Sequence, residues 1–100
     1  MIRGTTPTHT FAIPFDVSAI QTVKIIYAQD DEIVCEKLTE DCVLDGTTIQ
    51  TTLTQEDTLK FDHKKAVQIQ IRVLTAGGQA LASVIEKVGL SQLLDNEVLV

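Results

Sequence analysis

The side chains that could carry out catalysis are few in this chain and far apart in the sequence. Its only histidines are His9 and His63, and both lie in polar stretches that are expected to be an arm and a loop. A general base or a nucleophile works only where several groups converge in a pocket, so isolated histidines in polar sequence indicate solvent contact. We therefore expect no catalytic residue and no enzyme activity.

Acidic side chains gather in two short stretches, Asp30-Asp31-Glu32 and residues 41–45. Their carboxylates are the oxygen ligands that calcium prefers, but neither stretch has the twelve-residue spacing, central glycine and terminal glutamate of a calcium loop. Aspartate is also a common turn former, because its side chain hydrogen-bonds to nearby backbone. The two stretches therefore predict turns, and we expect no metal site and no bound cofactor.

Neither the cysteines nor the glycine pair predicts a ligand site. Cys35 and Cys42 lack the spacing of a metal site and should remain thiols in a reducing cytosol, where both serve as small apolar packing groups, Cys42 the more buried. Gly77-Gly78 is followed by neither a helix start nor a phosphate-binding lysine. Lys64-Lys65, the only adjacent basic pair, is typical of a solvated turn. No small-molecule substrate is predicted.

The composition limits the class of protein and its partners. One hundred residues, 44% of them hydrophobic, make a single domain with its own core. A net charge of −6 argues against binding to nucleic acid, which needs clustered lysine and arginine. No apolar run approaches the ~18 residues of a membrane span and no apolar signal region follows Met1, so we expect a cytoplasmically made protein without membrane contact.

The clearest structural element is a hairpin in residues 66–85. Apolar and polar residues alternate strictly through its first half, which is the period of a half-buried strand. The side chains expected in the core are those of Val67, Ile69, Ile71 and Val73. Gly77-Gly78 predicts a two-residue turn, and the register that follows places Val73 opposite Ala82.

Shorter strands are expected before this hairpin, at residues 10–13, 23–29, 32–37, 42–44 and 47–53. Turn formers separate them, and Asp45-Gly46 predicts a register with Cys42 opposite Ile49. About seven short strands with turns between them predict an all-β fold, an immunoglobulin-like two-sheet antiparallel β-sandwich. The Cys–Trp–Cys signature of true immunoglobulin domains is missing.

The chain is expected to have three parts. Residues 1–9 lack an apolar period and form an N-terminal arm, residues 10–88 form the β-sandwich domain, and residues 89–100 form a C-terminal tail. The leucines of the tail have helical spacing, which predicts a short amphipathic helix that docks on another surface. Within the domain, Thr54 is expected to cap a helical turn.

Apolar residues outside the expected core indicate contacts between copies of the protein. Three of them lie on the outer face of the hairpin at residues 23–37, two in the arm and three in the tail, and such patches mark interfaces. The candidate interface residues are Ile2, Pro7, Ile26, Ile33, Cys35, Leu90, Leu93 and Leu94. Two plainer interpretations stay open: the outer face is covered within the domain, and the ends of the chain are frayed.

Four stretches of the sequence are similar to a known family: MIRGTTPTHTFAIPFD, YAQ followed by E-K, LTQEDTLKF and VQIQIRVLTAGGQALAS. Together they resemble a family of small proteins from phages and prophages of Gram-positive gut bacteria, over roughly residues 1–88. The resemblance implies a virion structural or assembly component, in a head–tail connector, tail or baseplate, whose partners are other copies of itself and phage structural proteins. It also implies residence in the host cytoplasm during assembly and then in the virion. The family's usual glycine after YAQ is replaced by Asp30-Asp31, which leaves the type of that turn open.

A second class of function stays open, namely a phage-encoded immunoglobulin-like binding module such as an inhibitor of a host or defence factor. An acidic surface could mimic nucleic acid in such a role. A carbohydrate-binding module has less support, because it stacks sugars on exposed aromatic rings. All four aromatic residues are expected in the core: Phe11, Phe15, Tyr27 and Phe61.

Overall fold

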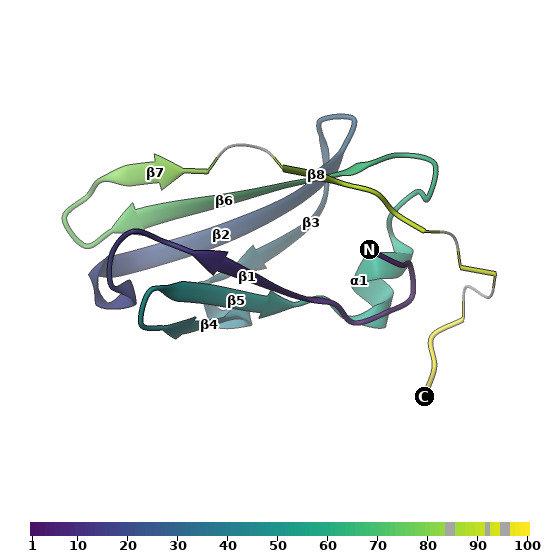
Figure 1. Ribbon diagram of the computed structural model, residues 1–100, viewed down its shortest axis with the longest axis horizontal. Coiled ribbons are helices and arrows are strands. Elements are labelled where there is room, and N and C mark those ends of the chain that lie inside the picture. The colour runs from purple at the N-terminus through teal and green to yellow at the C-terminus, as the bar shows by residue number, and fades with distance from the viewer. Residues whose placement is uncertain (84–85, 92, 95–96) are drawn as a thin grey trace.

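The computed structural model describes residues 1–83, 86–91, 93, 94 and 97–100, which form two antiparallel β-sheets packed face to face (Figure 1). The smaller sheet has the order β1 (Thr8–Ala12), β5 (Thr48–Thr52), β4 (Cys42–Asp45). The larger sheet has the order β3 (Glu32–Leu38), β2 (Ile20–Gln29), β6 (Val67–Thr75), and both β7 (Ala80–Ala82) and β8 (Glu86–Val88) pair with the far side of β6. The short helical segments are η1 (Val17–Ala19), η2 (Thr39–Asp41) and α1 (Gln55–Leu59).

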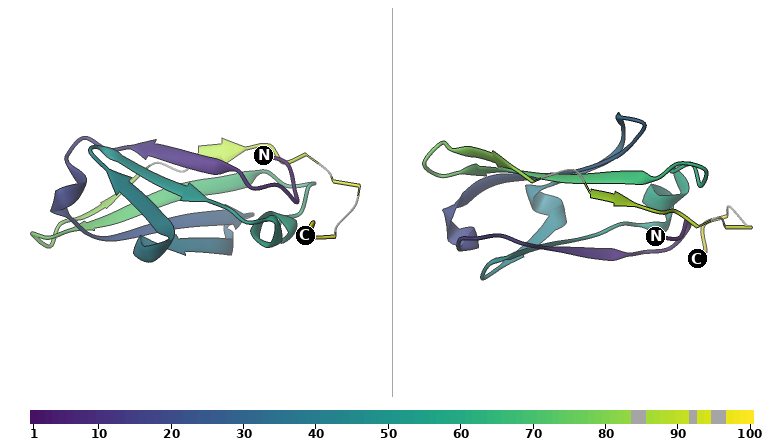
Figure 2. Two further views of the ribbon diagram at one scale, coloured as in Figure 1. Left: turned by 90° about the horizontal axis from the view of Figure 1, so that it is seen from below. Right: turned by 45° about the horizontal axis from the view of Figure 1, so that its top comes forward.

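The strand order is that of an immunoglobulin-like sandwich, whose two layers Figure 2 shows. The strands β1, β5 and β4 take the places of strands B, E and D, and β3, β2, β6 and β7 take those of C′, C, F and G. The predicted all-β, two-sheet antiparallel sandwich is therefore confirmed. Among the described strands none takes the place of strand A, which covers the outer side of strand B in such domains, so β1 lies at an edge.

The core lies mainly between β2, β6 and the inner face of the smaller sheet. The predicted inward residues of β6 are at most 7% exposed: Val67, Ile69, Ile71 and Val73. On β2, Val23, Ile25 and Tyr27 are each 0% exposed, and the ring of Tyr27 meets Phe61 edge-on with centroids 6.3 Å apart. Burial of an aliphatic side chain of this size contributes about 1.5–3 kcal/mol, so these two strands supply much of the stability.

The turn between β2 and β3 is made by Asp30 and Asp31, whose φ angles are 50° and 63°. Positive φ at both central positions is the type I′ turn, and this answers the question that the sequence left open. The conformation is uncommon for residues with a side chain. Gln68 holds it, because its Oε1 accepts from the N–H of Asp31 and its Nε2 donates to Oδ1 of the same residue.

A β-bulge in the β2–β3 pair reverses the predicted orientation of Cys35. The register shifts after Tyr27, so that Tyr27 lies opposite Cys35 while Ala28 lies opposite Ile33. Val34 is the extra residue, and Ile33 faces outward while Cys35 faces inward. Cys35 is 8% exposed and belongs to the core, so its placement on the outer face was wrong.

The turn between β6 and β7 also differs from the prediction. It has three residues, 76–78, of which Gly78 has a φ of 86° and donates its N–H to the carbonyl oxygen of Thr75. A loop of three residues changes the register by one compared with a loop of two. Val73 therefore lies opposite Leu81 and not opposite Ala82.

The turn between β4 and β5 is Gly46-Thr47, and the predicted pair of Cys42 with Ile49 was wrong. Cys42 lies opposite Thr51 instead. A shift of two residues leaves every side chain on its predicted face, so Cys42 still points inward. It is only half-buried because β4 is an edge strand, and the predicted order of burial of the two cysteines is reversed.

Both ends of the chain lie at the same end of the sandwich, next to α1 (Figure 1). Ile2 forms a parallel bridge with Ser91, and the amino group of Met1 donates to the carbonyl oxygen of Gly89 at 3.0 Å. The described part of residues 89–100 contains no helix, and the predicted short helix falls partly on residues outside that part, so it stays a prediction. The remaining tail residues, Gln92, Asp95 and Asn96, lie outside the described part. β1 begins at Thr8, two residues before the predicted start of the domain.

The single α-helical turn of the described chain begins as predicted. Oγ1 of Thr54 accepts from the N–H of Asp57 at 3.0 Å, and Oδ2 of Asp57 accepts from the N–H of Thr54 at 2.9 Å. These reciprocal bonds satisfy two amide groups that a helix start leaves free. No helix within the described ranges is both long and apolar enough to cross a membrane.

Candidate functional site

One long side of the sandwich is open, where the outer edge of β1 faces β7 and β8 of the other sheet (Figure 2). We call it the open flank and define it by residues 8–15 together with β7 and β8. Two hollows of about 420 and 280 Å³ lie along it, and Ala12, Ile71 and Ser83 line both. The hollows therefore form one continuous groove.

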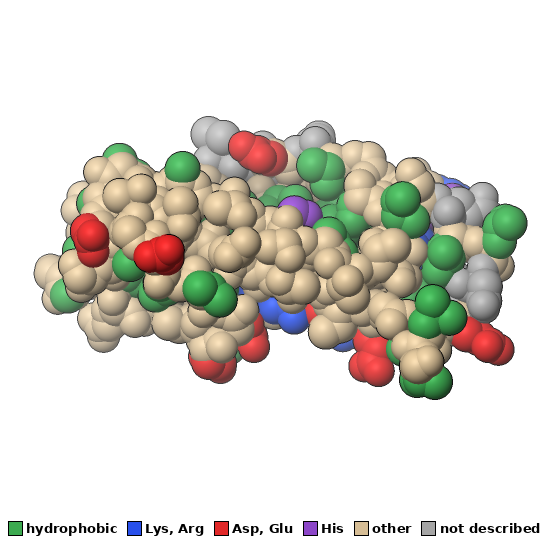
Figure 3. Space-filling view, turned by 60° about the horizontal axis from the view of Figure 1, so that its bottom comes forward, with side chains coloured by type: hydrophobic (Ala, Val, Ile, Leu, Met, Phe, Trp, Pro, Cys, Tyr) green, Lys and Arg blue, Asp and Glu red, His purple; other side chains and the backbone are tan. Residues whose placement is uncertain are grey.

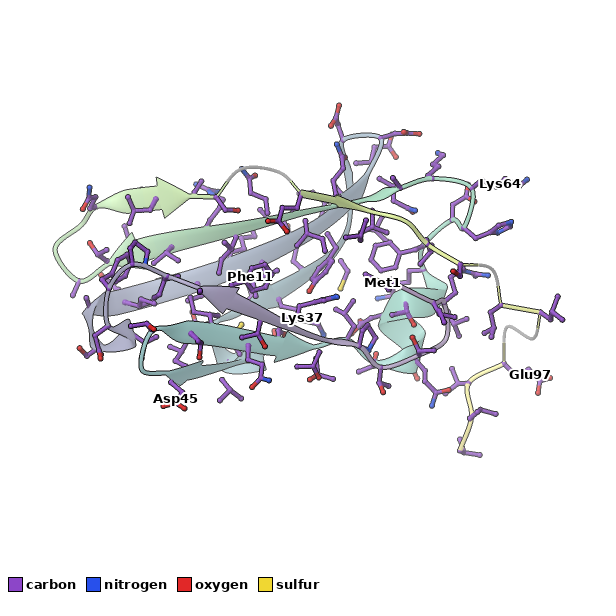
Figure 4. The ribbon with its side chains drawn as sticks, in the orientation of Figure 1. Met1, Phe11, Lys37, Asp45, Lys64 and Glu97 are labelled. Atoms are coloured by element: carbon purple, nitrogen blue, oxygen red, sulfur yellow. The ribbon has the colours of Figure 1, made fainter. Side chains whose placement is uncertain are left out.

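The floor of this groove is apolar. Ile69 and Ile71 of β6 line it and are 6% and 7% exposed. Phe11, labelled on β1 in Figure 4, and Phe15 line it from the smaller sheet, half-buried against the core. Glu86 is the only charged residue in the described walls of the two hollows. The groove is therefore suited to an uncharged, partly apolar partner.

Among the described strands, β1 is paired with β5 alone. The carbonyl oxygen of the half-buried Pro7 and the N–H of Ile13 both bond to the chain on the β5 side. Backbone groups alternate in direction along an antiparallel strand, so the odd-numbered residues between them also face β5. The N–H and C=O groups of Thr8, Thr10 and Ala12 point to the open flank, where no described strand pairs with them.

His9 lies on β1 in the wall of the groove, half-buried, and keeps part of the solvent contact that the sequence indicated. Its Nδ1 is 2.7 Å from the hydroxyl oxygen of Tyr27, and the ring centroids are 5.5 Å apart. Burial lowers the pKa of His9, and the positive charge of the N-terminus lowers it further. Burial also raises the pKa of Tyr27 well above its usual value. Both groups are therefore uncharged at neutral pH.

This pair favours structural hydrogen bonding over catalysis. Acid–base or nucleophilic chemistry needs a third, orienting group within hydrogen-bond reach. Within the described part of the chain no three His, Cys, Asp or Glu side chains are arranged to hold a metal ion. His63 lies in the loop between α1 and β6, as the sequence predicts. The groove is thus a candidate for recognition of another molecule.

A second apolar surface lies on the outer face of the larger sheet, and we call it the Ile26–Ile33 patch. Ile33 is 58% exposed, Ile26 is half-buried, and both border a shallow hollow of about 220 Å³ beside Gln68 and Gln70. The described chain has only two layers (Figure 2), so nothing in it covers this face. The interpretation that the outer face is covered within the domain does not apply to Ile33.

The candidate interface residues near the two ends differ in exposure. Leu93 packs on Gly4, where a Cβ would collide with the leucine side chain and where φ is 73°. Leu90 packs against the core. Ile2 and Leu94 remain accessible, at 48% and 95% exposure. The ends are therefore partly held by contacts within one chain.

The open edge of β1 and the place of His9 were missed in the sequence. The alternation that would have indicated them is present, because Thr8 and Thr10 are polar while Phe11 and Ile13 are apolar. Extending that period back by one step puts His9 on the inward face. No comparable pattern in the sequence indicates which side of the strand lacks a partner strand.

Comparisons with known proteins give little beyond the fold. No family model and no curated protein matches the chain. A solved structure with detectable similarity is the V domain of amphioxus IgVJ-C2, which is 18% identical, with 93% of this chain and 97% of that chain covered and a TM-score of 0.36. So distant a likeness carries no information about ligand or function, and the fold class rests on the sheet order itself.

Proposed function

We propose that the chain is a non-enzymatic structural or assembly protein of a phage particle, in a head–tail connector, tail or baseplate, and that it acts through protein–protein contacts. The observation that carries the proposal is the Ile26–Ile33 patch, where Ile33 stands 58% exposed on an uncovered sheet face. Apolar patches of this kind mark contact surfaces. The resemblance of residues 1–88 to phage proteins supplies the biological setting.

The chain end adds further apolar surface for such contacts. Leu94, Leu99 and Val98 are 95%, 74% and 39% exposed. The side chain of Gln55 holds the backbone of Leu99 at two points, donating to its carbonyl oxygen at 3.0 Å and accepting from its N–H at 2.7 Å. The tail is thus presented beside α1 with its apolar side chains outward.

The proposal is tested with Ile33→Asp and the matched control Val43→Asp. Val43 is 63% exposed on the other sheet, so the control adds the same charge at a comparably exposed position outside the patch. We expect Ile33→Asp to lower incorporation into phage particles by roughly tenfold, the effect of about 1.4 kcal/mol at one contact, while the control is incorporated like the parent. Quantitative mass spectrometry of purified particles measures this. Equal incorporation of both variants would exclude the patch, and absence of the parent from particles would exclude the assembly role.

The acidic tip of the β2–β3 hairpin favours a second candidate function. In this alternative the chain is an immunoglobulin-like binding module that inhibits a host or defence factor. Asp30, Asp31 and Glu32 are all exposed there. Lys65 offsets part of this charge through a 3.1 Å ion pair with Asp30. Such a cluster can imitate nucleic-acid phosphates. A parent chain that is absent from particles but binds a nucleic-acid-binding host protein with salt-sensitive affinity would support this candidate.

A further inference from the structure

The edge of β1 lacks the features that keep the other sheet edges from pairing with a further strand. A free edge offers a row of N–H and C=O groups to any second strand, and proteins usually guard it with charges, bulges or short strands. The other edges of the described sheets are guarded. β3 carries Glu32, Glu36 and Lys37 and a bulge, β4 has four residues and ends in Asp45, and β7 and β8 have three residues each.

β1 has none of these devices along its length. Residues 8–15 contain no aspartate, glutamate, lysine or arginine, and Pro7 and Pro14 lie outside the strand. In Figure 3, uncharged side chains and backbone cover most of the middle of the face shown, while most acidic side chains lie nearer its margins and a few basic ones lie below the middle. Glu86 of β8 lies across the groove, so the flank is not free of charge, but β1 itself adds no like charge to a contact between two copies of a chain of net charge −6.

We infer that β1 pairs antiparallel with β1 of a second copy, about a two-fold axis that passes through Thr10, and so joins the two smaller sheets into one. This deepens the proposed function, on which it rests, by naming a second copy as one partner. The backbone groups that no described strand pairs with belong to Thr8, Thr10 and Ala12, a set that is symmetric about its centre. A two-fold contact requires such a self-complementary surface.

The register follows from this symmetry. Thr10 exchanges two backbone hydrogen bonds with Thr10 of the second copy, and Thr8 lies opposite Ala12. Pro14 has no N–H to offer on the open side, so the pairing ends at Ala12. Odd-numbered side chains point inward, and Phe11 then lies beside His9 of the second copy. That aromatic pair covers the groove from both sides of the axis.

Two variants of Thr10 and one control test the pairing. The N–H of Thr10 is not used by β5, so Thr10→Pro is compatible with the monomer but removes the central donor of the proposed contact. Thr10→Lys brings two positive charges together at the axis. The control is Gln50→Lys, because Gln50 lies opposite Thr10 on β5, exposed on the same face but one strand away from the edge.

We expect the full chain and Gln50→Lys to form dimers in sedimentation velocity, with a dissociation constant at least roughly tenfold higher for both Thr10 variants. In samples dilute enough to be monomeric, the melting temperature of these variants should equal that of the parent. The Thr10 amide of the parent should also exchange hydrogen more slowly as concentration rises. If Thr10→Pro fails to fold, the dissociation constant of Thr10→Lys and the hydrogen exchange of the Thr10 amide in the parent test the pairing.

The outcomes separate this inference from the proposed function. Association that both Thr10 variants leave intact but Ile33→Asp abolishes would overturn the β1 pairing and leave the assembly role standing. A parent chain that stays monomeric in solution yet enters purified particles would also overturn the pairing alone. A parent chain that is monomeric and absent from particles would overturn both.

Discussion

Nδ1 of His9 lies 2.7 Å from the hydroxyl oxygen of Tyr27, and this hydrogen bond ties the edge strand β1 to the centre of the opposite sheet. Tyr27 is 0% exposed on β2, the strand between β3 and β6, where it lies opposite Cys35 and Ile69. The bond therefore fixes the strand that carries the open edge relative to the main core. Loss of this hydrogen bond should lower the free energy of unfolding and change its pH dependence.

Stability should fall as the pH drops below about 6.5. Burial and the N-terminal charge hold the folded-state pKa of His9 below its ordinary value of 6.5, so between the two values the unfolded chain binds a proton that the folded chain does not. Stability then rises with pH in this window and is lost toward acid. The groups near the imidazole are the Tyr27 hydroxyl, Glu86 in the groove wall and the terminal amino group. Urea midpoints measured from roughly pH 7.5 to 5 should change less in His9→Gln than in His63→Gln, and equal profiles would contradict the assignment.

Tyr27→Phe should destabilise the fold by about 1 kcal/mol, because it removes one neutral hydrogen bond and keeps the ring that packs on Phe61. Chemical denaturation measures the change. The double variant with His9→Ala supplies the control, since the hydroxyl should have almost no effect once its hydrogen-bond partner is removed. Additive losses would show that the two side chains do not act as a pair.

Ile71→Ala should cost about 2–4 kcal/mol, as truncation of a buried aliphatic side chain does. Ile71 is 7% exposed between the sheets, whereas Ile33 is 58% exposed on the outer face. The same truncation at Ile33 should therefore change the unfolding free energy by only about 0.5 kcal/mol or less. Similar melting temperatures for the two variants would mean that the inner face of β6 is misassigned.

Asp57→Ala should cost about 2–3 kcal/mol, because it removes an ion pair and a helix cap at once. Nζ of Lys37, labelled in Figure 4, lies 2.7 Å from Oδ2 of Asp57, and the side chains are 14% and 13% exposed. Burial alone would raise the pKa of Asp57, but the hydrogen bonds from Lys37 and from the Thr54 N–H outweigh it and lower that pKa. This stabilisation is present at neutral pH and is lost as the pH falls through the lowered value. Glu56→Ala, at an exposed position of the same turn, is the control and should leave stability nearly unchanged.

Native alkylation should label Cys42 faster than Cys35. Burial raises the pKa of both thiols, so neither is strongly reactive at neutral pH, and access decides the order. Cys42 is half-buried on the edge strand β4, while Cys35 is 8% exposed in the core. Peptide mass spectrometry over time gives the two rates, and unfolded protein serves as the reference in which they converge. Faster labelling of Cys35 would contradict the bulge at Val34.

The features that could be predicted from the sequence depend on neighbours within one strand or one turn. The alternation from Val67 to Val73 determines which side chains face inward, because successive residues of a strand point to opposite faces. The cap at Thr54 involves bonds within a few residues, and two adjacent turn formers indicate the position of the turn at Asp30-Asp31, although Gln68 holds its conformation. Each of these was visible before any pairing between strands was known.

The register between paired strands depends on residues that are far apart in the sequence. The extra residue Val34 and the three-residue loop before Gln79 each change a register, and with it the environment of Cys35 and Leu81. Their positions depend on hydrogen bonds from a neighbouring strand, which no single stretch of sequence contains.

The sequence by itself determined that residues 10–13 can form a strand with one apolar face. Only the tertiary structure decided that Thr10 faces an open flank and that His9 meets Tyr27, a residue 18 positions away on the other sheet. Which edge of a sheet lacks a partner is set by the order of all its strands, and that order is a property of the whole fold.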